Sequence, residues 1–255
     1  MCRHLGYLGG PRTLASLIYE GGHSLEHQSY APRMTQGNIL NADGFGAGWY
    51  HAGPGERGRP VRFRRDRPIW SDPSFREIAE VVETTCAVAA LRSATVGFPV
   101  DESCAQPFRS GAAGRGPGRF FSHNGKIEDF AGAEGKLREL AGELAAVPDA
   151  RAPVDSALLF ALAARLWHEG RGLGAGLAET VLAVSALAPG RYNLLAADGA
   201  ALAATTWGDS LFVRTPPGEV WISSEPLDDD PGWQPVPDRS LVTADLAAGV
   251  RVTPL

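Results

Sequence analysis

The sequence opens with MCRHLGYLGG, so a cysteine, Cys2, directly follows the first methionine. Cells remove a first methionine when the next side chain is small, and we therefore expect a processed chain that begins at Cys2. A thiol and a free α-amine would then belong to one residue, and ordinary groups of these two kinds titrate within about one pH unit of each other. The amine could take the thiol proton, directly or through water, so Cys2 could be a nucleophile that carries its own base. A small or buried cysteine without a chemical role is the alternative.

Two further motifs carry side chains suited to binding a charged or polarised oxygen. In ALRSATVG, Arg92 follows an apolar run and presents a planar fork that fits a carboxylate, although a surface ion pair is its common role. In FFSHNGKI we expect Asn124 and Gly125 at the end of a strand, where an amide side chain and a backbone N–H could form an oxyanion hole. An Asn-Gly hairpin turn is the alternative reading of that pair.

An acidic residue and several histidines complete the candidates. In APVDSALLF, Asp155 occupies the position of a helix N-cap, and it could also bind an ammonium group. His123 directly precedes Asn124, and we expect it to shape that loop. His23 and His27 are four residues apart, but Gly22 interrupts a helix there and no third ligand is evident, so we expect no metal site.

The elements that must position these residues change in type along the chain. Strands are predicted first, then helices, then antiparallel hairpins about Asp-Gly and Pro-Pro-Gly, which indicates an α+β fold. The predicted strands cover 2–9, 44–51, 86–95 and 120–125; the helices 13–20, 71–83, 133–147, 154–170 and 177–188; the hairpins 191–207 and 211–224; and the last strands 240–255. Residues 53–60 are predicted to form a turn, and we expect a single domain over residues 2–255.

Composition narrows the class of protein. Hydrophobic residues make up 44% and charged residues 21%, which is typical of a globular chain, and the net charge of −5 argues against nucleic acid as a partner. No apolar run is long enough to cross a bilayer, so we expect no membrane association and a cytoplasmic location. The three cysteines have no CxxC spacing; we expect Cys86 in the core and Cys104 in a loop that could be exposed.

These motifs, in this order, resemble the class II glutamine amidotransferase family of amino-terminal nucleophile (Ntn) hydrolases. The resemblance is carried by MC at the start, RSAT at 92–95, SHNG at 122–125 and an acidic residue before a helix at 155. The segments MCRHLGYLG, NADGFGAGWY, RYNLLAADG, LAATTWGDSL and SSEPLDDDPGW resemble one branch more closely, the amidohydrolases of ergothioneine biosynthesis. The resemblance implies a four-layer αββα sandwich of two antiparallel sheets between helical layers, and it implies no cofactor.

The resemblance also implies roles for the candidate residues. Cys2 would attack a γ-glutamyl amide, and Asn124 and Gly125 would hold the oxyanion. Arg92 would bind the α-carboxylate of the glutamyl group and Asp155 its α-ammonium, with His123 grouped with the substrate-binding residues. The small-molecule substrate implied by the branch is γ-glutamyl hercynylcysteine sulfoxide, from which glutamate would be released through a γ-glutamyl thioester.

The chain departs from the broader family pattern at two positions. Arg3 stands where many members have glycine in MCGI, and Ala90 stands where they have a histidine before the arginine. These changes put glutamine in doubt as substrate, and we expect no further domain that would use ammonia, so water is the expected acceptor. A glutaminase subunit that supplies ammonia to a partner synthase and a catalytically silent γ-glutamyl sensor remain alternatives. A homo-oligomer is compatible with the sequence, and the candidates for recognising the leaving group are Tyr30, Arg33, Phe45 and Trp49.

Overall fold

The strand that follows Cys2 lies in the middle of a sheet. The computed structural model describes residues 2–35, 40–51, 58–111 and 118–255. In these ranges β1 (Arg3–Thr13) belongs to a seven-stranded antiparallel sheet of order β11-β9-β10-β1-β4-β2-β3. Its other strands are β2 (Phe45–His51), β3 (Pro60–Arg65), β4 (Glu83–Leu91), β9 (Phe212–Arg214), β10 (Val220–Ser223) and β11 (Gln234–Pro235). A terminus held between β10 and β4 does not fray as an ordinary terminus does.

A second antiparallel sheet contains the other candidate motif. The described residues give it six strands in the order β13-β12-β8-β7-β6-β5. Its strands are β5 (Phe108–Arg109), β6 (Phe120–Ile127), β7 (Gly190–Ala197), β8 (Ala201–Thr206), β12 (Ser240–Asp245) and β13 (Gly249–Pro254). β6 lies between β5 and β7, and its residues Asn124 and Gly125 pair with β7.

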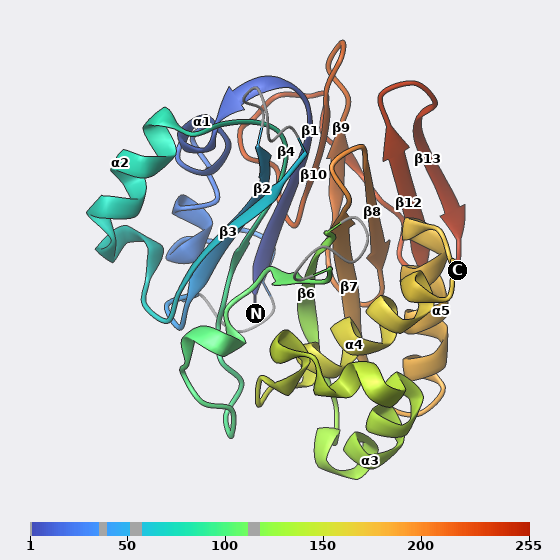
Figure 1. Cartoon of the computed structure of the whole chain (residues 1–255). Helices are drawn as coiled ribbons and strands as arrows, with labels where there is room; N and C mark the ends of the chain where they lie inside the picture. Colours follow the sequence, from blue (N-terminus) through green and yellow to red (C-terminus); the bar gives the residue numbers. More distant parts are fainter. Residues whose placement is uncertain (1, 36–39, 52–57, 112–117) are drawn as a thin grey trace.

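Helices cover the outer face of each sheet (Figure 1). The short α1 (Leu14–Ile18) and α2 (Pro73–Val81) lie against the first sheet, and α4 (Asp155–His168) and α5 (Leu173–Ser185) lie against the second, with α3 (Phe130–Ala141) packed on α4. Short 3-10 helices lie between these elements at His27–Ser29, Ile69–Ser71, Glu102–Cys104, Gly142–Ala146 and Pro148–Arg151.

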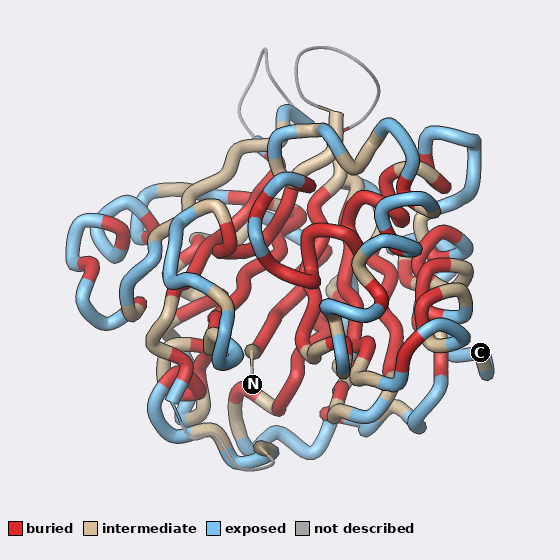
Figure 2. Tube along the Cα trace, turned by 90° about the horizontal axis from the view of Figure 1, so that it is seen from below, coloured by how far each residue is buried: buried red, intermediate tan, exposed pale blue. Residues whose placement is uncertain are grey.

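Three apolar interfaces separate the four layers. Leu14 and Phe75 of the first helical layer pack on β1 and its neighbours. Leu8 and Val88 pack across the space between the sheets, where they meet side chains such as Leu195. A third cluster joins the second sheet to α4 and α5. The predicted four-layer αββα sandwich is therefore confirmed, and Figure 2 shows that the strands are mostly buried while exposed residues gather on loops and outer helices.

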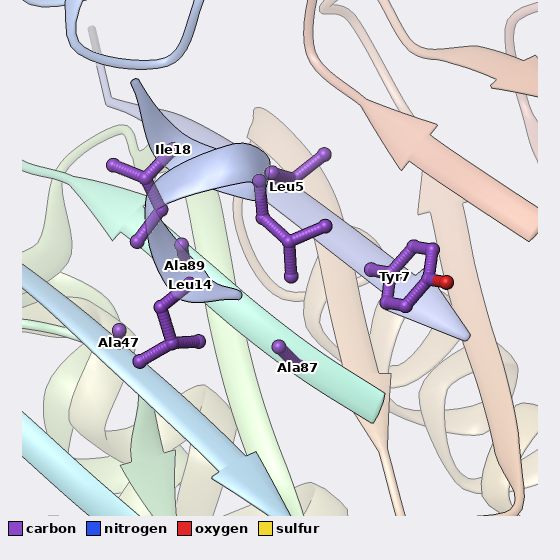
Figure 3. A pocket seen from close by; sticks show the side chains of 8 residues that line it. Leu5, Tyr7, Leu14, Ile18, Ala47, Ala87 and Ala89 are labelled. Carbon is purple, nitrogen blue, oxygen red and sulfur yellow. The ribbon is translucent and has the colours of Figure 1, made fainter. Parts of the chain in front are cut away.

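The alternation of side chains along β1 explains this packing. Leu5 and Tyr7 face α1, where small residues on the neighbouring strands, Ala47 and Ala87, leave room for the larger Leu14 (Figure 3). The space between them holds no volume that a water molecule could occupy. The opposite face looks into the sandwich, because a Cβ on Gly6 would meet Leu195 of the second sheet at 3.1 Å. Strand alternation therefore places Cys2 and His4 on this inner face.

Most predicted elements are found, with several corrections. Asn124 and Gly125 lie within β6 and pair with β7, so the hairpin-turn alternative is wrong and so is their placement at the strand end. β3 was not predicted, and its first residue, Pro60, falls in the segment predicted to form a turn; residues 52–57 lie outside the described ranges. Cys86 is buried in β4 as expected, but Cys104 is also buried.

Candidate active site

The register of β1 with β4 brings Cys2 to Arg92. Arg3 pairs with Leu91, so the antiparallel register sets Cys2 opposite Arg92. The Cys2 thiol lies 3.8 Å from the carbonyl oxygen of Ser93, the residue after that arginine. Cys2 is partly exposed, whereas the other two cysteines are buried. The one thiol that solvent and a substrate can reach therefore lies at the end of β4.

Hydrogen bonds across the sandwich join the Cys2 segment to Asn124. The amide Nδ2 of Asn124 donates to the hydroxyl oxygen of Ser224 at 3.3 Å, and the backbone N–H of His4 donates to the same oxygen at 3.0 Å. Ser224 in turn donates its N–H to the carbonyl of His4. Asn124 is completely buried, and its Oδ1 has no hydrogen-bond partner among the described residues. Ser224 thus links the Asn124 amide to His4, which lies two residues after Cys2. The amide keeps its Oδ1 as an acceptor and a second N–H as a donor.

Gly125 is required by the close approach of β7. A Cβ at this position would lie 2.0 Å from the carbonyl oxygen of Arg191 and 2.7 Å from Nε2 of His123. No side chain fits at this position, so only glycine is tolerated and no side chain covers its backbone N–H. The residue is partly exposed although its neighbour Asn124 is buried.

His123 is locked into the sandwich by both ring nitrogens. Its Nε2 lies 2.9 Å from the carbonyl oxygen of Arg191 and therefore donates, which leaves Nδ1 to accept from the Ser156 hydroxyl at 2.8 Å. Its backbone is held by the side chain of Gln106. Burial lowers the pKa of the ring, so it is neutral in the folded protein. This geometry supports the expected role in shaping the segment, and substrate contact by His123 stays a prediction.

Asp155 joins β6 to the start of α4. One carboxylate oxygen accepts the N–H of Ile127 at 2.8 Å, and the other accepts the N–H of Ser156 at 2.7 Å. The helix begins at Asp155 itself and its N-cap is Val154, so the predicted N-cap position is off by one residue. The buried carboxylate still complements the positive end of the helix dipole in the first turn. Oδ1 also lies 3.3 Å from the Ser156 hydroxyl, whereas Oδ2 retains a lone pair for a further donor.

Arg92 is held at the end of β4 by backbone carbonyls. Its Nη2 donates to the carbonyl of Pro99 at 2.8 Å and its Nη1 to that of Asp43 at 3.4 Å. Although the residue is only 3% exposed, it forms no ion pair with any described carboxylate. The alternative of a surface ion pair is therefore wrong, and a guanidinium without an anion remains beside the Cys2 segment.

Sequence reasoning missed a buried ion pair next to Cys2. Nε of Arg3 lies 2.7 Å from a carboxylate oxygen of Glu225, and both side chains have 0% exposure. Arg3 also donates to the carbonyl of Cys2 at 3.0 Å, and the second oxygen of Glu225 accepts the backbone N–H of Arg33 at 2.7 Å. The departure from MCGI at position 3 was the available signal, but its partner lies 222 residues away.

His4 was also not singled out from the sequence. Its ring is fully buried between the sheets, with Nδ1 3.3 Å from the Ser122 hydroxyl and Nε2 without a partner in the described part of the chain. Burial is the largest cause that lowers its pKa to about 3, and the nearby guanidinium of Arg3 lowers it further. A neutral imidazole therefore lies two residues from Cys2.

Short chains of contacts link the six predicted residues. Cys2 and Arg92 meet through the β1–β4 register, Asn124 and Gly125 of β6 are linked to the Cys2 segment through Ser224, and Asp155 lies where α4 meets the end of β6. His123 supports this group from inside the sandwich. Within the described ranges no group of three or more His, Cys, Asp or Glu side chains could hold a metal ion. No helix in these ranges is long and apolar enough to cross a membrane.

Comparison with known proteins gives relatives over the whole length. A family model described as class-II glutamine amidotransferases matches residues 19–230. The γ-glutamyl-hercynylcysteine sulfoxide hydrolase of Mycolicibacterium smegmatis is 42% identical over 256 residues, with 100% of both chains covered. The protein of the same name from Mycobacterium tuberculosis is 39% identical, with 100% of this chain and 97% of the relative covered.

Solved structures share the fold at lower identity. A class-II glutamine aminotransferase domain protein from Silicibacter pomeroyi superposes with a TM-score of 0.67 at 21% identity, and 99% of each chain is covered. The glutamine phosphoribosylpyrophosphate amidotransferase of Bacillus subtilis gives a TM-score of 0.69 at 14% identity, and this chain spans 49% of it. Together with the family match and the full-length relatives, the fold places the chain in the class II glutamine amidotransferase family.

Proposed function

We propose that this chain is a γ-glutamyl amidohydrolase whose nucleophile is Cys2, made amino-terminal by removal of Met1, which lies outside the described residues. The observation that carries the proposal is that an accessible thiol lies at the end of β4 beside a buried guanidinium that pairs with no described carboxylate, while Ser224 links the same segment to the buried Asn124 amide of β6. The α-amine of Cys2 takes the thiol proton, and the thiolate adds to the γ-carbonyl carbon. The remaining N–H of Asn124 and the backbone of Gly125 stabilise the oxyanion.

The glutamyl group is held at both of its charges. Arg92, which has no carboxylate partner among the described residues, binds the α-carboxylate, and Oδ2 of Asp155 accepts from the α-ammonium. Because both groups are fixed by backbone contacts, they orient the substrate without needing to reorganise. Collapse of the tetrahedral intermediate releases the amine, which takes the proton from the α-ammonium of Cys2, and water then cleaves the γ-glutamyl thioester to glutamate.

The substrate that best fits is γ-glutamyl-hercynylcysteine sulfoxide. The support is identity of about 40% over the whole length with two proteins named as hydrolases of this compound. A neutral, buried His4 and the charged pair at Arg3 also make the surroundings of the nucleophile unlike those of the broader family pattern. The products are glutamate and hercynylcysteine sulfoxide.

Mass spectrometry and kinetics test this proposal. The intact mass should lack Met1, and acid-quenched enzyme should carry a glutamyl adduct on Cys2. Cys2→Ala should abolish hydrolysis, while Arg92→Ala should impair every γ-glutamyl substrate and Arg138→Ala, an exposed arginine of α3, should impair none. Retention of Met1 in active enzyme, or full activity of Cys2→Ala, would refute the mechanism.

Substrate preference separates the remaining functions. Fast hydrolysis of free glutamine together with a stable complex with a synthase would support the glutaminase subunit. Binding of γ-glutamyl ligands without any turnover would support the sensor. Release of glutamate from the sulfoxide substrate at a much higher kcat/KM than from glutamine is the result that we expect.

A further inference from the structure

Two large aromatic side chains, Tyr30 and Trp70, are exposed side by side on the segments between α1 and α2. Tyr30 is 47% and Trp70 42% exposed, and their ring centroids lie 5.8 Å apart at an interplanar angle of 81°. The ring of His27 lies 5.2 Å from Tyr30 at 82°, so Tyr30 is held edge-on between two rings. Large exposed rings that contact each other are uncommon on a soluble protein unless they bind something.

No arginine or lysine of the described residues lies over either ring. Four of the six tryptophans have an arginine over the ring in the described structure, and Trp49 is buried. The four pairs are Arg12 with Trp221, Arg119 with Trp167, Arg214 with Trp233 and Arg239 with Trp207. Trp70 is the exception, an exposed tryptophan without an arginine over it among the described residues, and Tyr30 likewise has none. A cation from solution can therefore reach these faces without displacing a side chain.

The charges around the aromatic pair are already compensated. Arg33 is paired with Asp229 at 3.2 Å and also donates to the carbonyl of Pro226. Arg76 lies 3.4 Å from Glu26 and covers the ring of Tyr19. Because each guanidinium is paired with a carboxylate, its repulsion of a further cation is weakened.

A chain of contacts connects the aromatic pair with the nucleophile. Arg3 donates to the carbonyl of Cys2 and pairs with Glu225, whose second oxygen holds the backbone of Arg33. Tyr30 lies three residues before Arg33, so their Cα atoms are at most about 11 Å apart. The backbone that carries Tyr30 is therefore tied, through Arg33 and the buried ion pair, to the segment that holds Cys2.

The proposed substrate carries a cation far from the bond that is cut. The hercynyl group is the betaine of histidine and ends in a trimethylammonium. About nine covalent bonds, or roughly 11 Å when extended, separate that nitrogen from the amide nitrogen at which Cys2 would cut. Aromatic faces bind quaternary ammonium groups well, because these cations are poorly hydrated and have no N–H group that could donate a hydrogen bond to water.

We propose that Tyr30 and Trp70 form a subsite for the quaternary ammonium of the leaving group. This inference rests on the proposed function and names residues that select the substrate without taking part in bond cleavage. It extends the expectation for Tyr30 by a partner, Trp70, that no sequence motif indicated. Phe45 and Trp49, the other aromatic candidates, are buried and do not belong to this subsite.

Kinetics with two substrates test the subsite. The first is γ-glutamyl-hercynylcysteine sulfoxide, and the second is γ-glutamyl-S-(imidazol-2-yl)cysteine sulfoxide, which lacks the trimethylammonium side chain. Tyr30→Ala and Trp70→Ala should each lower kcat/KM for the first substrate about 5- to 30-fold, the range of a cation–π contact, and leave the second unchanged. Tyr30→Phe and Trp70→Phe keep an aromatic face and should retain most of the activity. Val81→Ala, at a residue of α2 that is 78% exposed, is the control for loss of exposed apolar surface.

The outcomes separate this inference from the proposed function. If the wild-type chain cleaves neither substrate, the proposed function fails. If it cleaves both and the alanine variants lose activity equally on both, or on neither, the subsite is refuted while the function stands. Quenching of tryptophan fluorescence by hercynine, lost in Trp70→Ala and absent with histidine, provides a readout independent of catalysis; equal quenching by both compounds would also refute the subsite.

Discussion

Removing Arg3 should destabilise the protein far more than its single ion pair suggests. Both members of the Arg3–Glu225 pair have 0% side-chain exposure and are 2.7 Å apart. In Arg3→Met the Glu225 carboxylate would stay buried with the Arg33 N–H as its remaining bond. Leaving one charge of a buried pair uncompensated costs about 3–5 kcal/mol, a large share of a total stability of about 5–15 kcal/mol.

The double variant tests whether the cost comes from the stranded charge. In Arg3→Met/Glu225→Gln no buried charge remains, and the Gln amide oxygen can still accept from Arg33. We expect this variant to be more stable than Arg3→Met alone, with a coupling energy of roughly 2 kcal/mol or more. Urea unfolding followed by tryptophan fluorescence and circular dichroism measures the free energy of unfolding of each variant.

An exposed pair of the same length is the matched control. Arg138 and Glu134 are also 2.7 Å apart, but their side chains are 51% and 40% exposed. Breaking that pair with Arg138→Met should cost only about 0.3–0.5 kcal/mol. A loss below about 1 kcal/mol in Arg3→Met, or a double variant whose loss is the sum of the two single losses, would refute the reasoning from burial.

Three further predictions concern the same region. Gly125→Ala should lower the free energy of unfolding by several kcal/mol, because its Cβ would overlap a backbone oxygen at 2.0 Å. Gly135→Ala, in α3 with open space around it, should raise the free energy of unfolding by about 0.5–1 kcal/mol. Equal melting temperatures of the two variants would contradict this. Burial lowers the pKa of His4 to about 3, so its stabilisation is complete above pH 6.5 and is lost as the pH falls toward 3. Between pH 7.5 and 5.5 the loss from His4 should be about 1.4 kcal/mol and should be missing in His4→Gln, as urea unfolding at the two pH values would show. A thiol reagent should label Cys2 of the folded protein within minutes and the two buried cysteines only after denaturation, and mass spectrometry showing three fast labels would contradict the burial described above.

Elements with strong local patterns could be predicted from the sequence. β1, the hairpin of β7 and β8 about Asp198 and Gly199, and α4 with its continuous run of alanine and leucine each carry their signal within a few residues. β3 does not, because PVRFRR contains only two large apolar side chains among three arginines. Its strand character comes from pairing with β2 at the edge of the sheet.

The candidate site could be assembled in part. The types of Cys2, Arg92 and Asp155 indicated their chemistry, but the identity of Asn124–Gly125 as strand residues depends on β7, which lies more than sixty residues later. An Asn-Gly pair has the same local signal in a hairpin turn, so only the tertiary pairing distinguishes the two. Glu225 lies in an acidic segment that looks like a solvated turn until Arg3 is placed beside it.

The position of β1 has a practical consequence for anyone who prepares this protein. Because its strand lies between two neighbours and starts beside Arg92, a purification tag fused ahead of Cys2 would lie against the candidate site and would block the amine that the proposed mechanism uses. β13 lies at the outer edge of the other sheet, where Figure 1 shows the chain end away from this region. Affinity tags, fluorophores and surface immobilisation should therefore be attached after Leu255.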